Sequence, residues 1–132
     1  MKISSLRAFQ ATRPFEISFE SGQAFRTKSE SVILRVGYDN GLFSHGESAP
    51  RNYVTGESLS SVSGLILDSF APLLLHREIG ALKDVEAILS DLEVFCLQKN
   101  PKPYNSALGA VDIALLDGLG KLEQQPASSY LG

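Results

Sequence analysis

The sequence predicts an α+β fold, in which a three-stranded antiparallel meander sheet is followed by a bundle of three main helices. Three observations support this class. Alternating apolar residues mark extended segments in the first part of the chain, an Asn-Gly pair joins two of them, and the remainder has helical periodicity. Strands that precede helices along the chain are typical of α+β domains.

The sheet is expected from three segments. Residues 3–12 form the first strand, residues 31–38 the second, in which Val32, Leu34 and Val36 alternate with more polar neighbours, and residues 42–47 the third. Asn40-Gly41 lies between the last two, and this pair readily adopts the positive φ angles of a tight hairpin turn. The second and third strands should therefore be antiparallel neighbours.

The connection between the first two strands is unusual. Phe15, Ile17 and Phe19 alternate and could extend the first strand, whereas residues 20–29 are predicted to be a long loop. Long loops in compact domains are commonly functional, so this segment is a candidate binding region.

Three helices are expected after the sheet. The first spans residues 58–70, with Thr55 or Ser58 as its cap, and Pro72 should end it. The second spans residues 82–97 and carries a regular apolar stripe, and Asn100-Pro101 should close it. The third spans residues 104–122 and is apolar on nearly all sides, which predicts burial on most of its surface.

Composition excludes several classes of protein. The chain has 132 residues, enough for one domain, and a net charge of −3 without any basic tract, which argues against nucleic-acid binding. No apolar stretch approaches the ~20 residues that span a bilayer, so no membrane association is expected. With a single cysteine, Cys96, no internal disulfide can form, and we expect a cytoplasmic location.

Few side chains suggest catalysis. His45 and Glu47 share one face of a strand, but we interpret them as a surface residue and a structural acceptor. Cys96 lies on an apolar helix stripe, as a core residue would. Asp112 and Asp117 interrupt the third helix, and we expect each to have a structural hydrogen-bonding partner. No catalytic or metal-binding residue is therefore predicted in this chain.

The two loops offer binding candidates instead. Arg26 lies in the long loop, and its guanidinium could hold a small acidic substrate through a bidentate fork. Arg51 and Tyr53 have the same standing in a second loop, residues 50–56. From composition alone, a solvated surface role is the favoured interpretation of each.

Four pieces of sequence, in order, resemble one family. They are Ala24-Phe25-Arg26-Thr27 with the strand after it, Asp39-Asn40-Gly41, Gly46-Glu47-Ser48-Ala49-Pro50 with Thr55-Gly56-Glu57, and residues 110–121. Together they resemble the N-terminal capping domain of the enolase superfamily, in its mandelate racemase and muconate-lactonizing-enzyme branch, and most of all the dipeptide epimerases.

The resemblance implies a role beside a (β/α) barrel. In the family, the barrel holds Mg²⁺ and the lysines that move a proton α to a carboxylate, while the capping domain contributes two substrate loops. Here these loops would be about residues 19–27 and 50–55. Arg26 would hold the acidic side chain of an L-Ala-D/L-Glu type dipeptide, and Phe19, Tyr53, Val54 and Thr55 would line the same pocket.

The resemblance also divides the chain. Residues 1–125 would be the capping domain and residues 126–132 the start of a linker to a barrel that this sequence does not contain, so the chain alone should be inactive. Alternatives remain open: the capping domain of a muconate cycloisomerase, o-succinylbenzoate synthase or N-acylamino-acid racemase, or a free-standing binding module without a catalytic role. A homo-oligomer is also compatible with the sequence.

Overall fold

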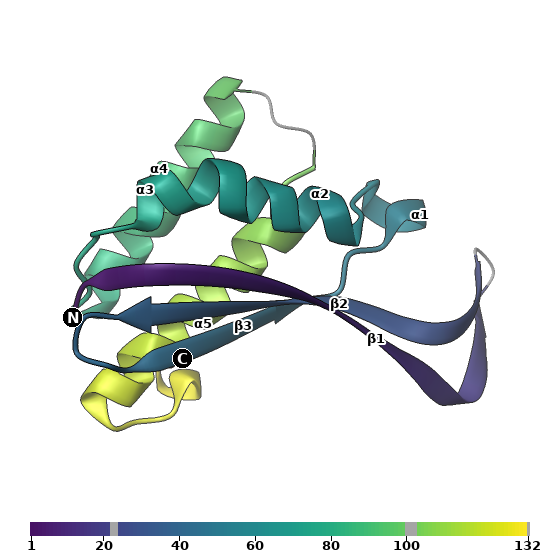
Figure 1. Cartoon of the computed structure of the whole chain (residues 1–132), viewed down its shortest axis with the longest axis horizontal. Coiled ribbons are helices and arrows are strands. Elements are labelled where there is room, and N and C mark those ends of the chain that lie inside the picture. Colours follow the sequence, from purple (N-terminus) through teal and green to yellow (C-terminus); the bar gives the residue numbers. More distant parts are fainter. Residues whose placement is uncertain (22–23, 100–102, 132) are drawn as a thin grey trace.

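The structure is a computed structural model that describes residues 1–21, 24–99 and 103–131, without the side chains of residues 17–26. Its strands are β1 (Ile3–Ser21), β2 (Ala24–Tyr38) and β3 (Phe43–Ser48), and its helical segments are α1 (Asn52–Thr55), α2 (Leu59–Gly64), the π-helical η1 (Leu65–Phe70), α3 (Ala71–Leu74), α4 (Leu82–Lys99), α5 (Asn105–Glu123) and the 3₁₀ turn η2 (Ala127–Tyr130). The sheet order β1-β2-β3, with both pairs antiparallel, confirms the predicted meander, and the helices follow it (Figure 1).

The turn between β2 and β3 forms as its sequence predicts. Gly41 has a φ of 85°, and its N–H donates to the carbonyl of Tyr38 at 3.1 Å. The side chain of Asn40 accepts a hydrogen bond from the N–H of Leu42 at 3.1 Å. A side chain with a Cβ is rarely stable at the φ of Gly41, which explains why glycine occupies this position.

The predicted long loop before β2 is wrong, because β1 and β2 form one long hairpin. Phe19 pairs with Arg26 and Ser21 with Ala24, so residues expected to be a loop belong to strands. The alternation of Phe15, Ile17 and Phe19 was the correct signal. The register shifts between Pro14 and Phe19, which accommodates a proline that cannot donate to the ladder. This hairpin extends beyond the body of the domain (Figure 1).

The first helix also differs from its prediction at its end. Ser58 and Ser61 form a reciprocal capping box, as expected for a cap at Ser58. Pro72 does not end the helix, since α3 continues to Leu74. The preceding turn is π-helical, with the N–H of Ala71 bonded to the carbonyl of Ile66. This wider turn relieves the clash that a proline ring causes in a regular α-helix.

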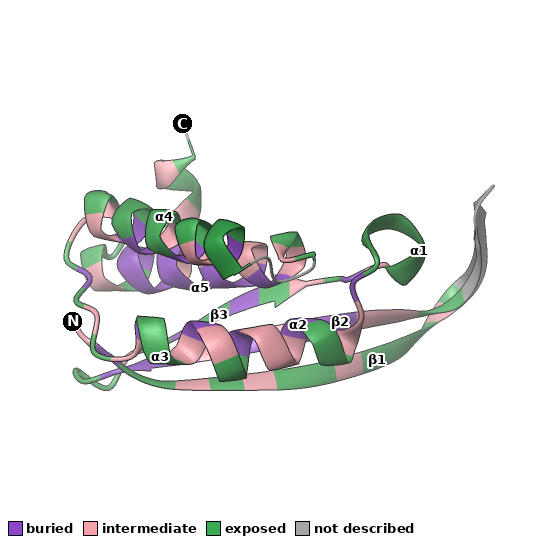
Figure 2. Ribbon diagram, turned by 90° about the horizontal axis from the view of Figure 1, so that it is seen from above, coloured by how far each residue is buried: buried purple, intermediate pink, exposed green. Residues whose placement is uncertain are grey.

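The core lies between the sheet and the helices. Val32, Leu34 and Val36 are fully buried on the inner face of β2, and α5 packs directly on β3. In Figure 2 the buried parts of α5 and β3 lie against each other. A Cβ on Gly46 would lie 1.9 Å from the carbonyl oxygen of Ala110, so only glycine allows this approach. Most apolar residues of α5 are therefore buried in the core of this domain, which agrees with the predicted burial on most sides.

Candidate functional site

The segment after β3 contains three of the predicted binding residues. It was expected to be a loop, but it contains the one-turn helix α1, which ends at Gly56 with a φ of 76°. Tyr53, Val54 and Thr55 all lie on this turn and are exposed, with Tyr53 46% and Val54 62% accessible. The structure thus presents a partly apolar surface at this point.

The beginning of this segment is fastened to the sheet. The guanidinium of Arg51 donates hydrogen bonds to the carbonyl oxygens of Glu30 on β2, at 3.1 Å, and of Pro50, at 2.9 Å. Pro50 itself is buried. Arg51 therefore connects the segment to the hairpin through its Nη1 group, which is bonded to backbone carbonyls.

The end of the segment is fastened to α5. Glu57 is 1% exposed, and its carboxylate accepts hydrogen bonds from the N–H of Ser106 at 2.8 Å and from its hydroxyl at 2.7 Å. Ser106 lies in the first turn of α5, where unpaired N–H groups and the helix dipole favour a negative charge. A carboxylate that is this deeply buried is tolerated because both oxygens have partners.

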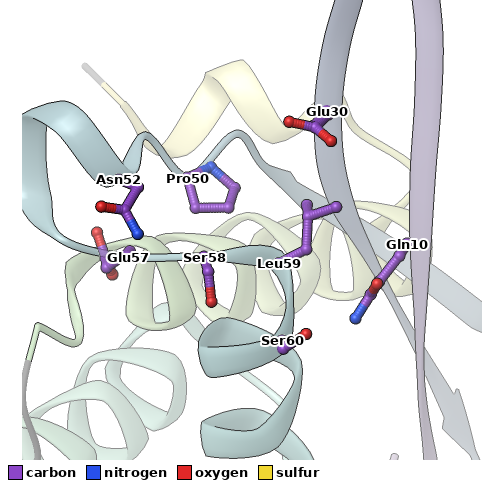
Figure 3. A pocket seen from close by; sticks show the side chains of 8 residues that line it. All are labelled: Gln10, Glu30, Pro50, Asn52, Glu57, Ser58, Leu59 and Ser60. Atoms are coloured by element: carbon purple, nitrogen blue, oxygen red, sulfur yellow. The ribbon is translucent and has the colours of Figure 1, made fainter.

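A cavity of about 300 Å³ opens between this segment and the hairpin (Figure 3). It is lined by Gln10, Glu30, Pro50, Asn52, Glu57, Ser58, Leu59 and Ser60. Glu30 forms an ion pair with Lys28 at 3.0 Å, and the carboxylate of Glu57 accepts a hydrogen bond from the hydroxyl of Ser106. Pro50 and Leu59 add apolar surface to the polar side chains, so the lining of the cavity is mixed in character. Across the described residues, no group of three or more His, Cys, Asp or Glu side chains could hold a metal ion.

Arg26 and Phe19 are backbone neighbours across the hairpin, as direct partners in the β1–β2 register. Their side chains lie outside the described residues, so their predicted place in the pocket stays a prediction. Helix α1 lies at the end of the body from which the hairpin projects (Figure 1). The backbone thus brings the two predicted binding segments to the same end of the molecule.

The remaining polar candidates from the sequence, His45, Glu47 and Asp117, lie on or beside β3. The side chains of His45 and Glu47 are exposed on β3. Asp117 accepts hydrogen bonds from the backbone N–H of His45 at 2.8 Å and from Lys121 at 2.7 Å, and Lys121 also donates to the carbonyl of Phe43 at 2.9 Å. This pair on α5 satisfies backbone groups of the edge strand β3, which confirms a structural role for Asp117.

Asp112 and Cys96 complete the set. Asp112 is half-buried and accepts no hydrogen bond within the described part of the chain, so its predicted partner is not found, and burial raises its pKa. Cys96 is 1% exposed in the core, and burial, together with the charge of Glu93, raises its pKa. A thiol with a raised pKa is a poor nucleophile, which agrees with its predicted core role.

The structural role of Glu57 is not apparent from the sequence. The residue precedes Ser58, and the two serve different helices: Glu57 caps α5, whereas Ser58 caps α2. The pairing of Glu57 with Ser106 spans 49 positions, so no local pattern could identify it. The run Thr55-Gly56-Glu57 drew attention to this residue only because it is part of the family resemblance.

Comparison with known proteins identifies relatives over the whole chain. Residues 3–132 match the family described as "Mandelate racemase / muconate lactonizing enzyme, N-terminal domain". An L-Ala-D/L-Glu epimerase of Bacillus subtilis (strain 168) is 33% identical over 132 residues, which are 100% of this chain and 34% of that protein. An L-Lys-D/L-Arg epimerase of Desulforapulum autotrophicum is 30% identical over 125 residues, 92% of this chain and 31% of that protein.

Solved structures agree with these matches. A substrate-liganded complex of the Bacillus subtilis L-Ala-D/L-Glu epimerase superposes with a TM-score of 0.83 at 32% identity, covering 100% of this chain and 34% of the other. An N-succinyl Arg/Lys racemase from Bacillus cereus gives a TM-score of 0.83 at 25% identity, covering 100% and 34%. The chain thus spans about a third of the length of the relatives it matches. None of the helices within the described residues has the length and apolar character needed to cross a membrane.

Proposed function

The chain belongs to the mandelate racemase and muconate-lactonizing-enzyme family as its N-terminal domain, and from this premise we propose that it is the capping and specificity domain of a dipeptide epimerase acting on L-Ala-L-Glu type substrates. The observation that carries the proposal is the match over the full chain to an L-Ala-D/L-Glu epimerase. The geometry supports it, because a braced, exposed α1 and the projecting hairpin occupy the same end of the domain.

In this proposal the chemistry belongs to a partner. A (β/α) barrel would hold Mg²⁺, which stabilises the negative charge formed when a proton is removed α to a carboxylate. The described residues do not fit a metal site, so we assign no Mg²⁺ ligand to this chain. Its own residues would exclude water and select the substrate. We keep residues 1–125 as the capping domain, 126–132 as the start of a linker, and the cytoplasm as the location, since the one cysteine is buried and unpaired.

Arg26 is the proposed specificity residue. A guanidinium can bind the side-chain carboxylate of a substrate glutamate through two parallel hydrogen bonds. Phe19, its partner in the β ladder, and Tyr53, Val54 and Thr55 on α1 would provide the walls around the dipeptide. The substrate is thus expected to be small, acidic and bound between the hairpin and α1.

A fusion protein tests this function. The chain would replace the matching third of the Bacillus subtilis enzyme, and epimerisation of L-Ala-L-Glu would be measured, with the unfused chain expected to be inactive. Arg26→Ala should lower kcat/KM for L-Ala-L-Glu by about 100-fold, equivalent to about 2.7 kcal/mol. Arg26→Lys, which keeps the charge without the fork, should lose less. An active fusion in which Arg26→Ala leaves L-Ala-L-Glu turnover unchanged would contradict the assignment.

A second candidate function has a specific observation behind it. The Bacillus cereus N-succinyl Arg/Lys racemase matches the fold equally well, with a TM-score of 0.83. We therefore include racemisation of N-acylated amino acids as the alternative. The same fusion assayed with N-succinyl-L-arginine separates the two, because each proposal predicts turnover of only one of these substrates.

A further inference from the structure

The segment that carries α1 has little packing to hold it in place. α1 is a single turn, and none of its residues is buried. An isolated turn of helix is unstable, because its few hydrogen bonds do not offset the cost of ordering its backbone. A cavity of about 300 Å³ also lies between this segment and the hairpin, so the space between them is partly open (Figure 3). The position of α1 therefore depends mainly on hydrogen bonds.

These hydrogen bonds form a continuous path through the segment, from β2 to α5. Arg51 Nη1 donates to the carbonyl of Glu30 at 3.1 Å. The carbonyl of Arg51 accepts from Thr55 Oγ1 at 3.3 Å, and this oxygen accepts from the N–H of Glu57 at 3.4 Å. The carboxylate of Glu57 then accepts from the N–H and hydroxyl of Ser106. The two ends of the segment thus rest on different elements of the domain.

Arg51 makes the link to the strand that carries the proposed specificity residue. The carbonyl that it binds belongs to Glu30, which lies on β2 together with Arg26. Arg51 is half-buried, and its Nη1 group also donates to the carbonyl of Pro50 at 2.9 Å. A guanidinium that is used to hold backbone suits a positioning role better than direct contact with a substrate. The distance between α1 and the strand of Arg26 is set by this link.

We propose that Arg51 is a positioning residue for substrate specificity, which fixes α1 relative to β2 and so sets the length of the acidic side chain that fits between α1 and Arg26. This inference rests on the proposed function. A displacement of about 1 Å far from the reacting atoms can change turnover by about 100-fold. One methylene group in a fitted pocket changes kcat/KM by roughly 10- to 200-fold. A wall that is held in place can therefore distinguish glutamate from aspartate, although both carry the same charge.

Two dipeptides of equal charge test the proposal. In the fusion with the Bacillus subtilis barrel, kcat/KM would be measured for L-Ala-L-Glu and L-Ala-L-Asp. Arg51→Met keeps an apolar stem without donors, and the preference for L-Ala-L-Glu should fall by about 10-fold, mainly through a higher KM. Arg51→Lys, which keeps a donor, should retain part of the preference. The matched control is Arg77→Met, which removes an exposed ion pair with Asp91 between α3 and α4 and should leave the preference unchanged.

A second measurement reports the position of α1 without requiring activity. Thr12 is exposed and is the direct partner of Glu30 on β1, so a nitroxide attached to the Thr12→Cys variant would lie on the hairpin beside this link. Cys96 is 1% exposed and should remain unlabelled. Paramagnetic broadening of the amide signals of residues 52–55 would be compared in the isolated chain with and without Arg51→Met, and the substitution should change it.

Each other outcome overturns the proposal. Broadening that is unchanged in Arg51→Met, or changed equally in Arg77→Met, would mean that Arg51 does not set the position of α1. Changed broadening with an unchanged preference between the two dipeptides, or an equal loss of turnover for both, would mean that Arg51 has only a structural role. A fusion that turns over neither dipeptide would refute the proposed function and the specificity role with it, while the broadening would still show whether Arg51 fixes α1.

Discussion

The two segments expected to face a substrate are supported in different ways. The segment carrying α1 is fastened at both ends, by Arg51 to a carbonyl of β2 and by Glu57 to the first turn of α5. The far part of the β1–β2 hairpin extends beyond the helices and is held by pairs within its own ladder, such as Phe19 with Arg26. One small domain can thus present two kinds of structure at the same end. We call the segment of residues 50–57 that carries α1 the wall, and the far part of the β1–β2 hairpin the arm.

The division has a physical consequence. Binding residues are placed most accurately when their neighbours are locked by packing and hydrogen bonds, which describes α1. An arm that makes few contacts with the body can change position at a lower cost in free energy. We therefore expect substitutions in the body to alter α1 and leave the arm largely unchanged.

The largest effect is expected at the packing of α5 on β3. Gly46→Ala would place a Cβ 1.9 Å from the carbonyl oxygen of Ala110, so α5 must move away from the sheet. The expected loss is about 3 kcal/mol or more in the free energy of unfolding, measured by urea denaturation. Because α5 also holds Glu57, the wall should be lost with it.

Gly109→Ala is the matched control for this substitution. A Cβ there meets nothing within 4 Å, and the position is helical, so stability should rise by about 0.5–1 kcal/mol. Equal effects of the two alanines would show that α5 does not rest on β3 through Gly46.

The next effect concerns Glu57 itself. Glu57→Ala leaves the N–H of Ser106 without its acceptor and should cost about 2–3 kcal/mol. Hydrogen exchange should accelerate in residues 51–57 and at the start of α5, with little change in the hairpin. Glu57→Gln, which keeps one acceptor oxygen, should lose less. Faster exchange throughout the hairpin as well would mean that wall and arm form one unit.

The stability at alkaline pH depends on Tyr38, a buried residue at the end of β2. Burial raises the pKa of Tyr38 to about 12 from 10, while its hydroxyl is 2.9 Å from that of Ser44. Because the pKa is higher in the folded state, the contribution is complete below pH 10 and is lost as pH rises from 10 to 12. It amounts to at most about 2.7 kcal/mol.

The matched pair of variants is Tyr38→Phe and Tyr53→Phe. The first should flatten the decline in urea-derived stability between pH 10 and 12, and the second, on exposed α1, should leave the decline as it is. A decline that persists unchanged in Tyr38→Phe would show that Tyr38 is not its source.

Local pattern was sufficient for most of the fold. The Asn40-Gly41 turn, the strand alternation around Leu34 and the stripes of α4 and α5 each contain their signal within a few residues. The long loop was mispredicted because glycine and polar residues outweighed the alternation of Phe15, Ile17 and Phe19. Pro72 was misjudged because the rule for prolines applies to a regular helix, and here a π turn precedes it.

The candidate site was less accessible to sequence reasoning. Arg51 and Glu57 act through partners 21 and 49 positions away, a carbonyl of β2 and a residue of α5. A backbone carbonyl carries no residue identity, so nothing in the sequence marks it as the partner of Arg51. The pairing of Arg7 with Arg35 across β1 and β2 likewise appears only once the register of the strands is known.

The smallest loss of stability is expected at Arg51, at the start of the α1 segment. Arg51→Ala removes two hydrogen bonds to carbonyls, one of them to the hairpin at Glu30, and should cost about 1 kcal/mol. This hydrogen bond also joins the α1 segment to the base of the hairpin, so the two segments can be coupled through it. Asn52→Ala, exposed and one position away, is the control and should change stability little. Hydrogen exchange decides the coupling: acceleration confined to residues 51–55 would mean that the arm is independent, whereas acceleration that spreads into β2 beyond Glu30 would mean that the wall holds the arm in place.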